Sequence, residues 1–171
     1  MTPALRTWLL AVGSNVEPES SLARGIGLLR ARFDVECVSA GFDVPAVGRP
    51  DQPDFVNLAV RLRSDLPLRA LRAVCRHLEA CCGRRRSVDR LAPRTLDLDV
   101  VAGSDGVVET AVARIPSPEL LEEPHVLVPA AEVWPDYVHP ASGRTLSELA
   151  AERVPPGWPG RRRPGAPPGS R

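Results

Sequence analysis

The sequence contains no lysine, so all 22 of its Lys and Arg side chains are arginines. Arginine abundance alone therefore says little about function, and only the placement of arginines along the chain is informative. With 21 acidic residues the formal net charge is only +1. A charge this small creates no field that would attract nucleic acid or an anionic membrane surface, and we expect neither as a partner.

Long hydrophobic runs are also lacking, and none reaches the length of a membrane-spanning helix. The run Trp8–Val12 is too short for a signal peptide and has no cleavage-site pattern, so we expect a cytoplasmic protein. The four cysteines match no zinc-binding spacing, and we expect them to be reduced and mostly buried. They are Cys37, Cys75, Cys81 and Cys82.

A phosphate-binding loop of the G-x-x-x-x-G-K-S/T type is absent as well. The chain has instead an acidic stretch, Pro93–Val100, just after the arginines Arg84–Arg86. Because successive side chains of a strand point to opposite faces, Asp97 and Asp99 would share one face. Neighbouring carboxylates repel each other unless a cation lies between them, and Mg²⁺ takes one or two carboxylates together with substrate phosphates. The pattern predicts a Mg-nucleotide site, but an edge strand with one solvated face gives the same alternation.

The rest of the pattern alternates strands and helices. We expect strands over 5–12, 35–44 and 55–63 besides the acidic strand, and helices over 21–33 and 67–82. The resulting order, β-α-β-β-α-β, predicts an α+β fold of the ferredoxin-like type. In this fold both helices pack on one face of an antiparallel sheet, and here a C-terminal extension follows.

The extension begins with short apolar runs and then changes composition. Thr145 and Glu148 form a capping-box pattern that predicts a short helix over 145–153. After Val154 the chain is almost wholly Pro, Gly and Arg, and it cannot bury enough apolar surface to offset the entropy of ordering. We therefore expect one domain over residues 1–153 and a disordered tail over 154–171.

Five stretches together resemble a known enzyme family. They are Ala11–Asn15, Val44–Gly48, Asp51–Asn57, Glu79 with Gly83–Arg84, and Pro93–Asp99. In this order and at these spacings the chain resembles the 6-hydroxymethyl-7,8-dihydropterin pyrophosphokinase family. The resemblance implies a ferredoxin-like fold and the transfer of a pyrophosphoryl group from ATP to the pterin alcohol. AMP is then released, as a step of folate biosynthesis.

The resemblance also implies roles for individual residues. Asp97 and Asp99 are expected to bind two Mg²⁺ ions that contact ATP. The catalytic residues implied are Arg84, Arg94, Asp97 and Asp99, and those that bind ATP are Arg84, Arg86, Arg94 and Ser117. The pterin-binding residues implied are Gly13, Val44, Pro45, Val47, Phe55, Asn57 and His125. Phe55 would offer an aromatic face to the pterin, and Asn57 a donor and an acceptor to its amide-like edge.

The chain departs from the family pattern at four positions. Ser117, Glu123 and His125 stand where the family has a histidine, an ATP-facing arginine and a phenylalanine, and Leu91 replaces a loop tryptophan. Glu123 would place a negative charge beside a polyanion. The flat ring of His125 can still stack on a pterin. The sequence is equally consistent with a structural role, in which His125 is partly buried and hydrogen-bonded to the backbone. These departures motivate an alternative, a divergent pterin-binding paralogue with weak or no kinase activity.

An RNA-binding domain of ferredoxin-like type is disfavoured. The strands lack the aromatic pattern on which such domains stack bases, and the net charge is almost zero. We expect the partners to be the two small molecules, ATP and the pterin, and the protein to be a monomer.

Overall fold

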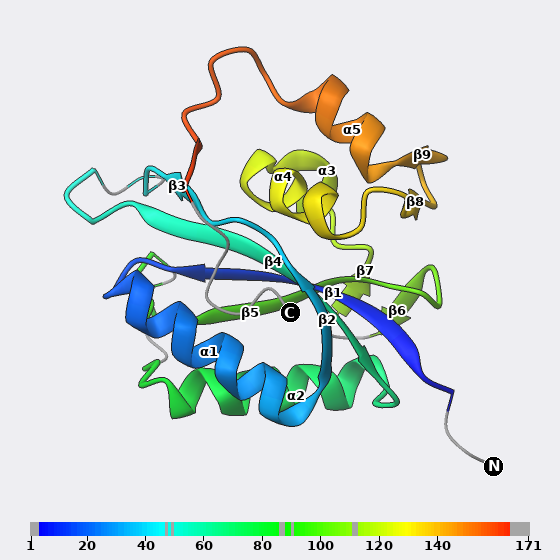
Figure 1. The fold of residues 1–171 in the computed structure, drawn as a ribbon, viewed down its shortest axis with the longest axis horizontal. Coiled ribbons are helices and arrows are strands. Elements are labelled where there is room, and N and C mark those ends of the chain that lie inside the picture. The colour runs from blue at the N-terminus through cyan, green and yellow to red at the C-terminus, as the bar shows by residue number, and fades with distance from the viewer. Residues whose placement is uncertain are drawn as a thin grey trace.

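Antiparallel strands form the middle layer of the molecule, with helices on both faces of the sheet (Figure 1). The computed structural model describes residues 4–46, 48, 50–85, 88–89, 91–110 and 113–164. Two residues with predicted roles, Val47 in the pterin site and Arg86 in the ATP site, lie outside the described residues.

The central strand of the sheet is β1 (Arg6–Ser14). It pairs with β4 (Phe55–Ser64) on one side and with β5 (Asp97–Gly103) on the other. Beyond β4 lie β2 (Asp34–Val38) and β3 (Phe42–Val44), which both pair with it. Every one of these pairings is antiparallel. Strand β5 is last in the strand order and therefore lies at one edge of the sheet.

Two helices, α1 (Pro18–Arg32) and α2 (Leu68–Cys81), cover one face of the sheet (Figure 1). Their apolar stripes pack against Trp8, Leu10 and Val12, which point to this face from β1. The order of strands and helices and their layering confirm the predicted α+β fold of ferredoxin-like type.

The opposite face carries α3 (Glu119–Glu122), α4 (Pro124–Val133) and α5 (Leu146–Arg153) (Figure 1). A second core cluster lies here and includes Leu9 from β1 and Leu127 from α4. The central strand is therefore buried on both faces, which explains its nearly continuous apolar sequence. Over the described part of the chain, no helix is both long and apolar enough to cross a membrane.

Short hairpins connect the larger elements of the C-terminal half. Strand β6 (Val108–Thr110) pairs with β7 (Ala113–Ile115), and β8 (Val138–His139) pairs with β9 (Arg144–Thr145). Helix α5 begins directly after the second hairpin. The Thr145 hydroxyl accepts the backbone N–H of Glu148, and the Glu148 carboxylate accepts the N–H of Thr145, so the predicted capping box is confirmed.

The single strand predicted over 35–44 is wrong, because the structure has two strands there. Ser39 separates β2 from β3: its hydroxyl accepts the N–H of Ala59 at 2.8 Å, and its own N–H donates to the Ala59 carbonyl. The next N–H, that of Ala40, leaves the sheet and donates to the Glu132 carboxylate of α4 at 2.9 Å. The break depends on contacts with distant residues, which hydrophobic alternation along 35–44 does not reveal.

Part of the segment predicted to be disordered is ordered. Strand β10 (Arg161–Arg162) pairs with β3 at the edge of the sheet. Arg163 donates to the Asp43 carboxylate at 2.7 Å and also contacts Glu19. Composition predicted disorder because the segment has few apolar groups, whereas the structure orders it through backbone pairing and ion pairs. Residues 165–171 of the predicted tail lie outside the described residues.

Candidate active site

A row of residues crosses the sheet on the face covered by α4. In the register of the strands, Gly13 of β1 lies opposite Asn57 of β4 on one side and opposite Asp97 of β5 on the other. A side chain at Gly13 would meet Asn57, because a Cβ placed there would lie 3.1 Å from the Asn57 Oδ1 atom. The glycine therefore keeps open the space between the amide and the carboxylate.

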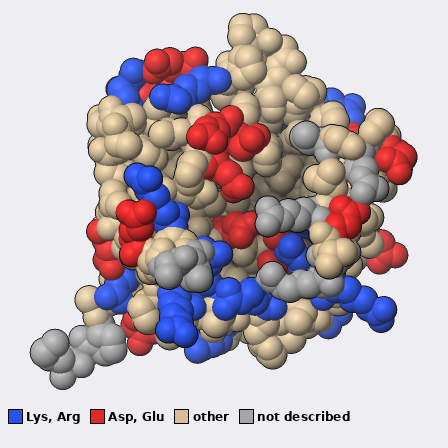
Figure 2. Space-filling view, turned by 180° about the vertical axis from the view of Figure 1, so that it is seen from behind, with Lys and Arg blue, Asp and Glu red and all other residues tan. Residues whose placement is uncertain are grey.

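This space is part of a cavity of about 280 Å³. Figure 2, which views the molecule from behind Figure 1, shows a hollow with acidic side chains beside it and basic side chains gathered below it. The cavity walls include nine residues with predicted roles: Gly13, Val44, Pro45, Phe55, Asn57, Arg94, Asp97, Asp99 and His125. These nine are half of the 18 residues that line the cavity.

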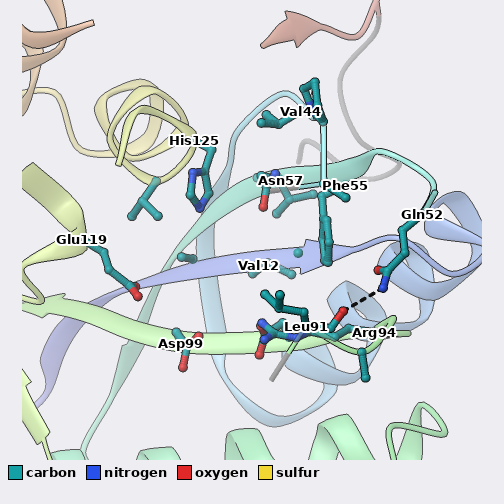
Figure 3. Close-up of a pocket in the computed structure, with 18 residues that line it drawn as sticks. Val12, Val44, Gln52, Phe55, Asn57, Leu91, Arg94, Asp99, Glu119 and His125 are labelled. Carbon is teal, nitrogen blue, oxygen red and sulfur yellow. Dashed lines mark hydrogen bonds and ion pairs between the residues drawn. The ribbon is translucent and has the colours of Figure 1, made fainter. Parts of the chain in front are cut away.

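One end of the cavity presents flat and amide side chains. Phe55 and Asn57 are two residues apart on β4 and share a face, while His125 reaches into the cavity from the first turn of α4 (Figure 3). The Nδ1 atom of His125 lies 3.4 Å from the Glu123 carboxylate. Burial lowers the pKa of His125, although Glu123 opposes this shift, so the neutral imidazole is favoured. This end suits a flat, polar ring system.

The other end is acidic. Asp97 and Asp99 share the cavity face of β5, while Leu98 between them points into the core beneath α1 and α2. Asp97 forms ion pairs with both Arg84 and Arg94. In the described part of the chain, Asp99 has no ion-pair partner within 4.0 Å. Two arginines therefore compensate the charge of Asp97, while no described arginine pairs with Asp99.

The pKa of Asp99 is raised to about 6. The main cause is desolvation by the surrounding cavity walls, although Asp99 keeps an exposed edge, and the neighbouring charges of Asp97 and Glu119 raise the pKa further. The pKa of Glu119 is raised too, by burial and by Glu123 and Asp97. Figure 3 shows the Glu119 side chain extending toward the strand that carries Asp99. This end of the cavity therefore has an excess of negative charge.

The acidic pair suits a divalent cation. Over the described ranges, no three His, Cys, Asp or Glu side chains form a complete metal site. Mg²⁺ does not require one, because it commonly binds one or two carboxylates and takes its other ligands from water and substrate phosphates. Asp97 and Asp99 offer two such carboxylates on one face of β5, and both line the cavity together with a third carboxylate, Glu119.

Arg84 is anchored beneath this acidic pair and does not line the cavity. Its guanidinium donates to Glu79 at 2.9 Å, to the Leu96 carbonyl at 3.1 Å and to Asp97. Glu79, which is only 3 % exposed, also accepts the backbone N–H of Leu98 at 2.9 Å. The buried pair of Glu79 and Arg84 thus connects α2 to the first residues of β5.

Asn15 connects three segments around the cavity. Its Oδ1 atom accepts the N–H of Arg94 at 2.8 Å, and its Nδ2 group donates to Gln52 Oε1 at 3.1 Å and to the Pro53 carbonyl at 3.4 Å. Gln52 in turn donates to the Leu91 carbonyl at 2.8 Å (Figure 3). Asn15, the first residue after β1, therefore holds two long loops against the sheet.

Some cavity residues were missed by the sequence analysis. Glu119, Gln52 and Ala11 line the cavity but had no predicted role. Ala11 could have been found, because it lies two residues from Gly13 on the same strand and shares its face. Ser117, predicted to bind ATP, does not line the cavity, and its N–H donates to the Val101 carbonyl at 2.7 Å. Its role in ATP binding stays a prediction.

The fold and this cavity define a class: a small-molecule transferase on a ferredoxin-like sheet, with a ring-binding end and an acidic end that suits metal and phosphate. Comparison with known proteins gives the particular family. Residues 9–135 match the model of the family described as 7,8-dihydro-6-hydroxymethylpterin-pyrophosphokinase (HPPK). The chain belongs to this family.

Three curated relatives carry the same name, 2-amino-4-hydroxy-6-hydroxymethyldihydropteridine pyrophosphokinase. The chain is 37% identical to the Synechocystis protein over 144 residues, which is 82% of this chain and 73% of the relative. It is 34% identical to the Methylorubrum extorquens protein over 86% of this chain and 94% of the relative. For the Bacillus subtilis protein the identity is 35%, over 72% of this chain and 75% of the relative.

Proposed function

We propose that the cavity on the α4 face is the site at which this chain carries out the reaction of its family. As a member of that family, the chain is an ATP-dependent pyrophosphokinase that pyrophosphorylates 6-hydroxymethyl-7,8-dihydropterin in folate biosynthesis. The observation that carries the site assignment is the row Asn57, Gly13 and Asp97, which joins a ring-binding end to an acidic end. A pterin and a triphosphate bound at these ends would meet over Gly13.

The pterin would bind at the end formed by β3, β4 and α4. Phe55 offers an aromatic face and the neutral imidazole of His125 offers a second flat surface, so the bicycle can stack between them. Asn57 has both a donor and an acceptor for the amide-like edge of the pterin. Val44 and Pro45 supply apolar contacts from the end of β3.

The triphosphate would bind at the acidic end. Asp97 and Asp99 would hold two Mg²⁺ ions, which when bound neutralise phosphate charge and polarise the phosphorus that the pterin hydroxyl attacks. Arg94 lines the cavity and would turn from Asp97 to a phosphate oxygen once Asp97 binds metal. Arg84, held by Glu79 and the Leu96 carbonyl, would keep Asp97 in place rather than move with the nucleotide.

The direct test of this function is product analysis. Purified protein incubated with Mg-ATP and 6-hydroxymethyl-7,8-dihydropterin should yield AMP and the pyrophosphorylated pterin in equal amounts. Pterin binding without AMP release would instead support the alternative of a divergent paralogue with weak or no kinase activity. Release of ADP in place of AMP would exclude pyrophosphoryl transfer.

Removal of the divalent metal should stop the reaction but leave the affinity for the pterin nearly unchanged. Because Asp97 and Asp99 lie on β5, which β1 separates from Phe55 and Asn57 on β4, we expect EDTA to abolish AMP release while the Kd for the pterin alone changes less than about twofold. Calorimetry with and without EDTA measures this, and added Mg²⁺ should restore turnover. Full activity in EDTA would refute the proposed metal site.

Glu123 gives a prediction about nucleotide affinity. It occupies the N-cap position of α4 without a capping hydrogen bond from its side chain, and its carboxylate lies 3.4 Å from His125 Nδ1. The side chain is 47% exposed and does not line the cavity. A positive charge at this position should attract the triphosphate, but solvent weakens the effect, so we expect Glu123→Arg to tighten Mg-ATP binding roughly two- to fivefold. Calorimetric titration of Mg-ATP measures the change.

The neighbouring carboxylate provides the control for this variant. Glu122 is exposed on α3, and Glu122→Arg adds the same charge at the adjacent position. An equal gain in both variants would mean that only the net charge of the protein matters. No gain in Glu123→Arg would place this residue outside the reach of the nucleotide.

We also propose that the protein acts in the cytoplasm as a monomer. Its four cysteines, Cys37, Cys75, Cys81 and Cys82, are all free, in keeping with a reducing compartment. Both ends of the cavity, with Phe55 and Asn57 at one and Asp97 and Asp99 at the other, are lined by residues of one chain. The mass of the protein in solution at the concentration of the activity assay tests the monomer.

A further inference from the structure

The end of the described chain forms a strap against the sheet. We use the name C-terminal strap for residues 155–164, which run from α5 across the molecule to the outer edge of β3 (Figure 1). In the strap, β10 pairs with β3 and the N–H of Arg163 donates to the Gly41 carbonyl at 2.8 Å. Without the strap, β3 would be the open edge of the sheet.

Side chains of the strap fasten β3 to two helices. Arg163 donates to the Asp43 Oδ1 atom from Nε at 3.0 Å and from Nη2 at 2.7 Å, and its Nη1 group contacts Glu19 in the first turn of α1. Arg162 donates to Glu132 of α4 at 2.9 Å. One arginine therefore bridges β3 and α1, and the next bridges the strap and α4.

The strap also completes a small apolar cluster on the cavity side of β3. The rings of Phe42 and Trp158 lie 6.0 Å apart between centroids, and Phe42 and Val44 are 4 % and 8 % exposed. Val128 of α4 packs in the same cluster. This cluster fixes the position of β3 relative to α4, which carries His125.

The fastened strand leads directly into the pterin end of the cavity. In the register of the sheet, Phe42 lies opposite Asn57 and Val44 lies opposite Phe55. Val44, Pro45 and Ala46 then form a wall of the cavity. Strand β3 is only 3 residues long, so its own pairing with β4 fixes it weakly and the strap supplies a second anchor.

We propose that Arg163 is a positioning residue for pterin binding. By bridging Asp43 of β3 and Glu19 of α1, it keeps β3 and the cavity wall Val44–Ala46 in place beside the pterin. The proposal rests on the assignment of the pterin to this cavity. Arg163 does not touch the cavity itself, so its effect is confined to the wall that β3 forms. The acidic end lies on β5, on the other side of β1 and β4, and should be unaffected.

The test is Arg163→Ala in the full-length chain. We expect the Kd of 6-hydroxymethyl-7,8-dihydropterin, measured by calorimetry without nucleotide, and its KM to rise roughly tenfold. The KM for Mg-ATP and kcat at saturating pterin should stay within about twofold. Arg163→Lys keeps a positive charge for Asp43, so it should retain part of the pterin affinity that Arg163→Ala loses. If the loss came only from lower overall stability, pterin affinity would not depend on this charge.

Arg161→Ala is the matched control. Arg161 lies on the same strand and is exposed, and its side chain has no hydrogen bond or ion pair to the described residues. This variant should bind the pterin like the unmodified protein. Equal losses of pterin affinity in Arg161→Ala and Arg163→Ala would overturn the proposal. The loss would then come from the net positive charge of the strap and not from the contacts of Arg163.

Two further outcomes are decisive. If Arg163→Ala lowers the Tm but leaves the pterin Kd unchanged, the strap only covers the sheet edge and the proposal fails. If Arg163→Ala does not fold, Glu19→Ala removes the exposed partner on α1 and should raise the pterin Kd about threefold; an unchanged Kd overturns the proposal. Failure of the unmodified protein to bind pterin would instead refute the proposed function.

Discussion

Replacing Asp99 by alanine is expected to lower kcat at least about a thousandfold while pterin binding stays nearly intact. Asp99 lies on the cavity face of β5, and its pKa is raised to about 6, first by desolvation and then by the charges of Asp97 and Glu119. Removing it takes away a proposed metal ligand but breaks no ion pair among the described residues. Steady-state AMP release and calorimetric pterin titration measure the two quantities.

Asp97→Ala should abolish turnover as well, but it is the less specific variant. Asp97 pairs with both Arg84 and Arg94, so its loss leaves two guanidinium groups without this partner and should also lower stability. Asp105→Ala removes a carboxylate of the turn after β5 that pairs with Arg6 and does not line the cavity, and it serves as the control for Asp99→Ala. Turnover retained in Asp99→Ala would remove Asp99 from the proposed metal site.

The second large effect is expected at Glu79. Its carboxylate is buried, accepts the N–H of Leu98 and pairs with Arg84. Glu79→Ala would leave a buried N–H and a largely buried guanidinium with fewer partners, so we expect the free energy of unfolding to fall by about 3 kcal/mol. For a chain of this size the Tm should fall by about 10 °C. Thermal unfolding followed by circular dichroism measures this.

Two further variants make the Glu79 experiment specific. Glu79→Gln keeps an oxygen that can accept the Leu98 N–H but loses the charge, so it should destabilise less than alanine. Arg76→Ala changes an exposed residue of the same helix and should alter the free energy of unfolding by less than about 0.5 kcal/mol. A Glu79→Ala protein as stable as Arg76→Ala would contradict the structural role given to the buried pair.

Local patterns predicted the parts of the site that lie on single strands. Alternation along β4 placed Phe55 and Asn57 on one face, and alternation along β5 placed Asp97 and Asp99 on one face. The structure brings these two faces to the same cavity. The row through Gly13 could not be predicted, because it depends on the register between strands that are far apart in the sequence.

Contacts between distant segments account for what the sequence analysis missed. Glu119 enters the cavity from a helix of only 4 residues, which has no periodic pattern to predict it. Glu79 lies four residues after Cys75, beside the apolar stripe of α2, but the helical period does not reveal its partners, Arg84 and the Leu98 N–H. Order in the strap likewise comes from β3 and from Asp43, which lies 120 positions from Arg163.

The bare backbone at Gly13 has a geometric consequence. Neighbouring strands of a sheet are spaced by about 4.8 Å, so Asn57 and Asp97, one strand away on either side of Gly13, are held about 10 Å apart by the hydrogen bonds of the sheet. In the proposed site, the sheet therefore sets the distance between the heterocycle and the phosphate chain. The span that the pterin alcohol has to cover then depends on strand spacing and not on the length of any loop.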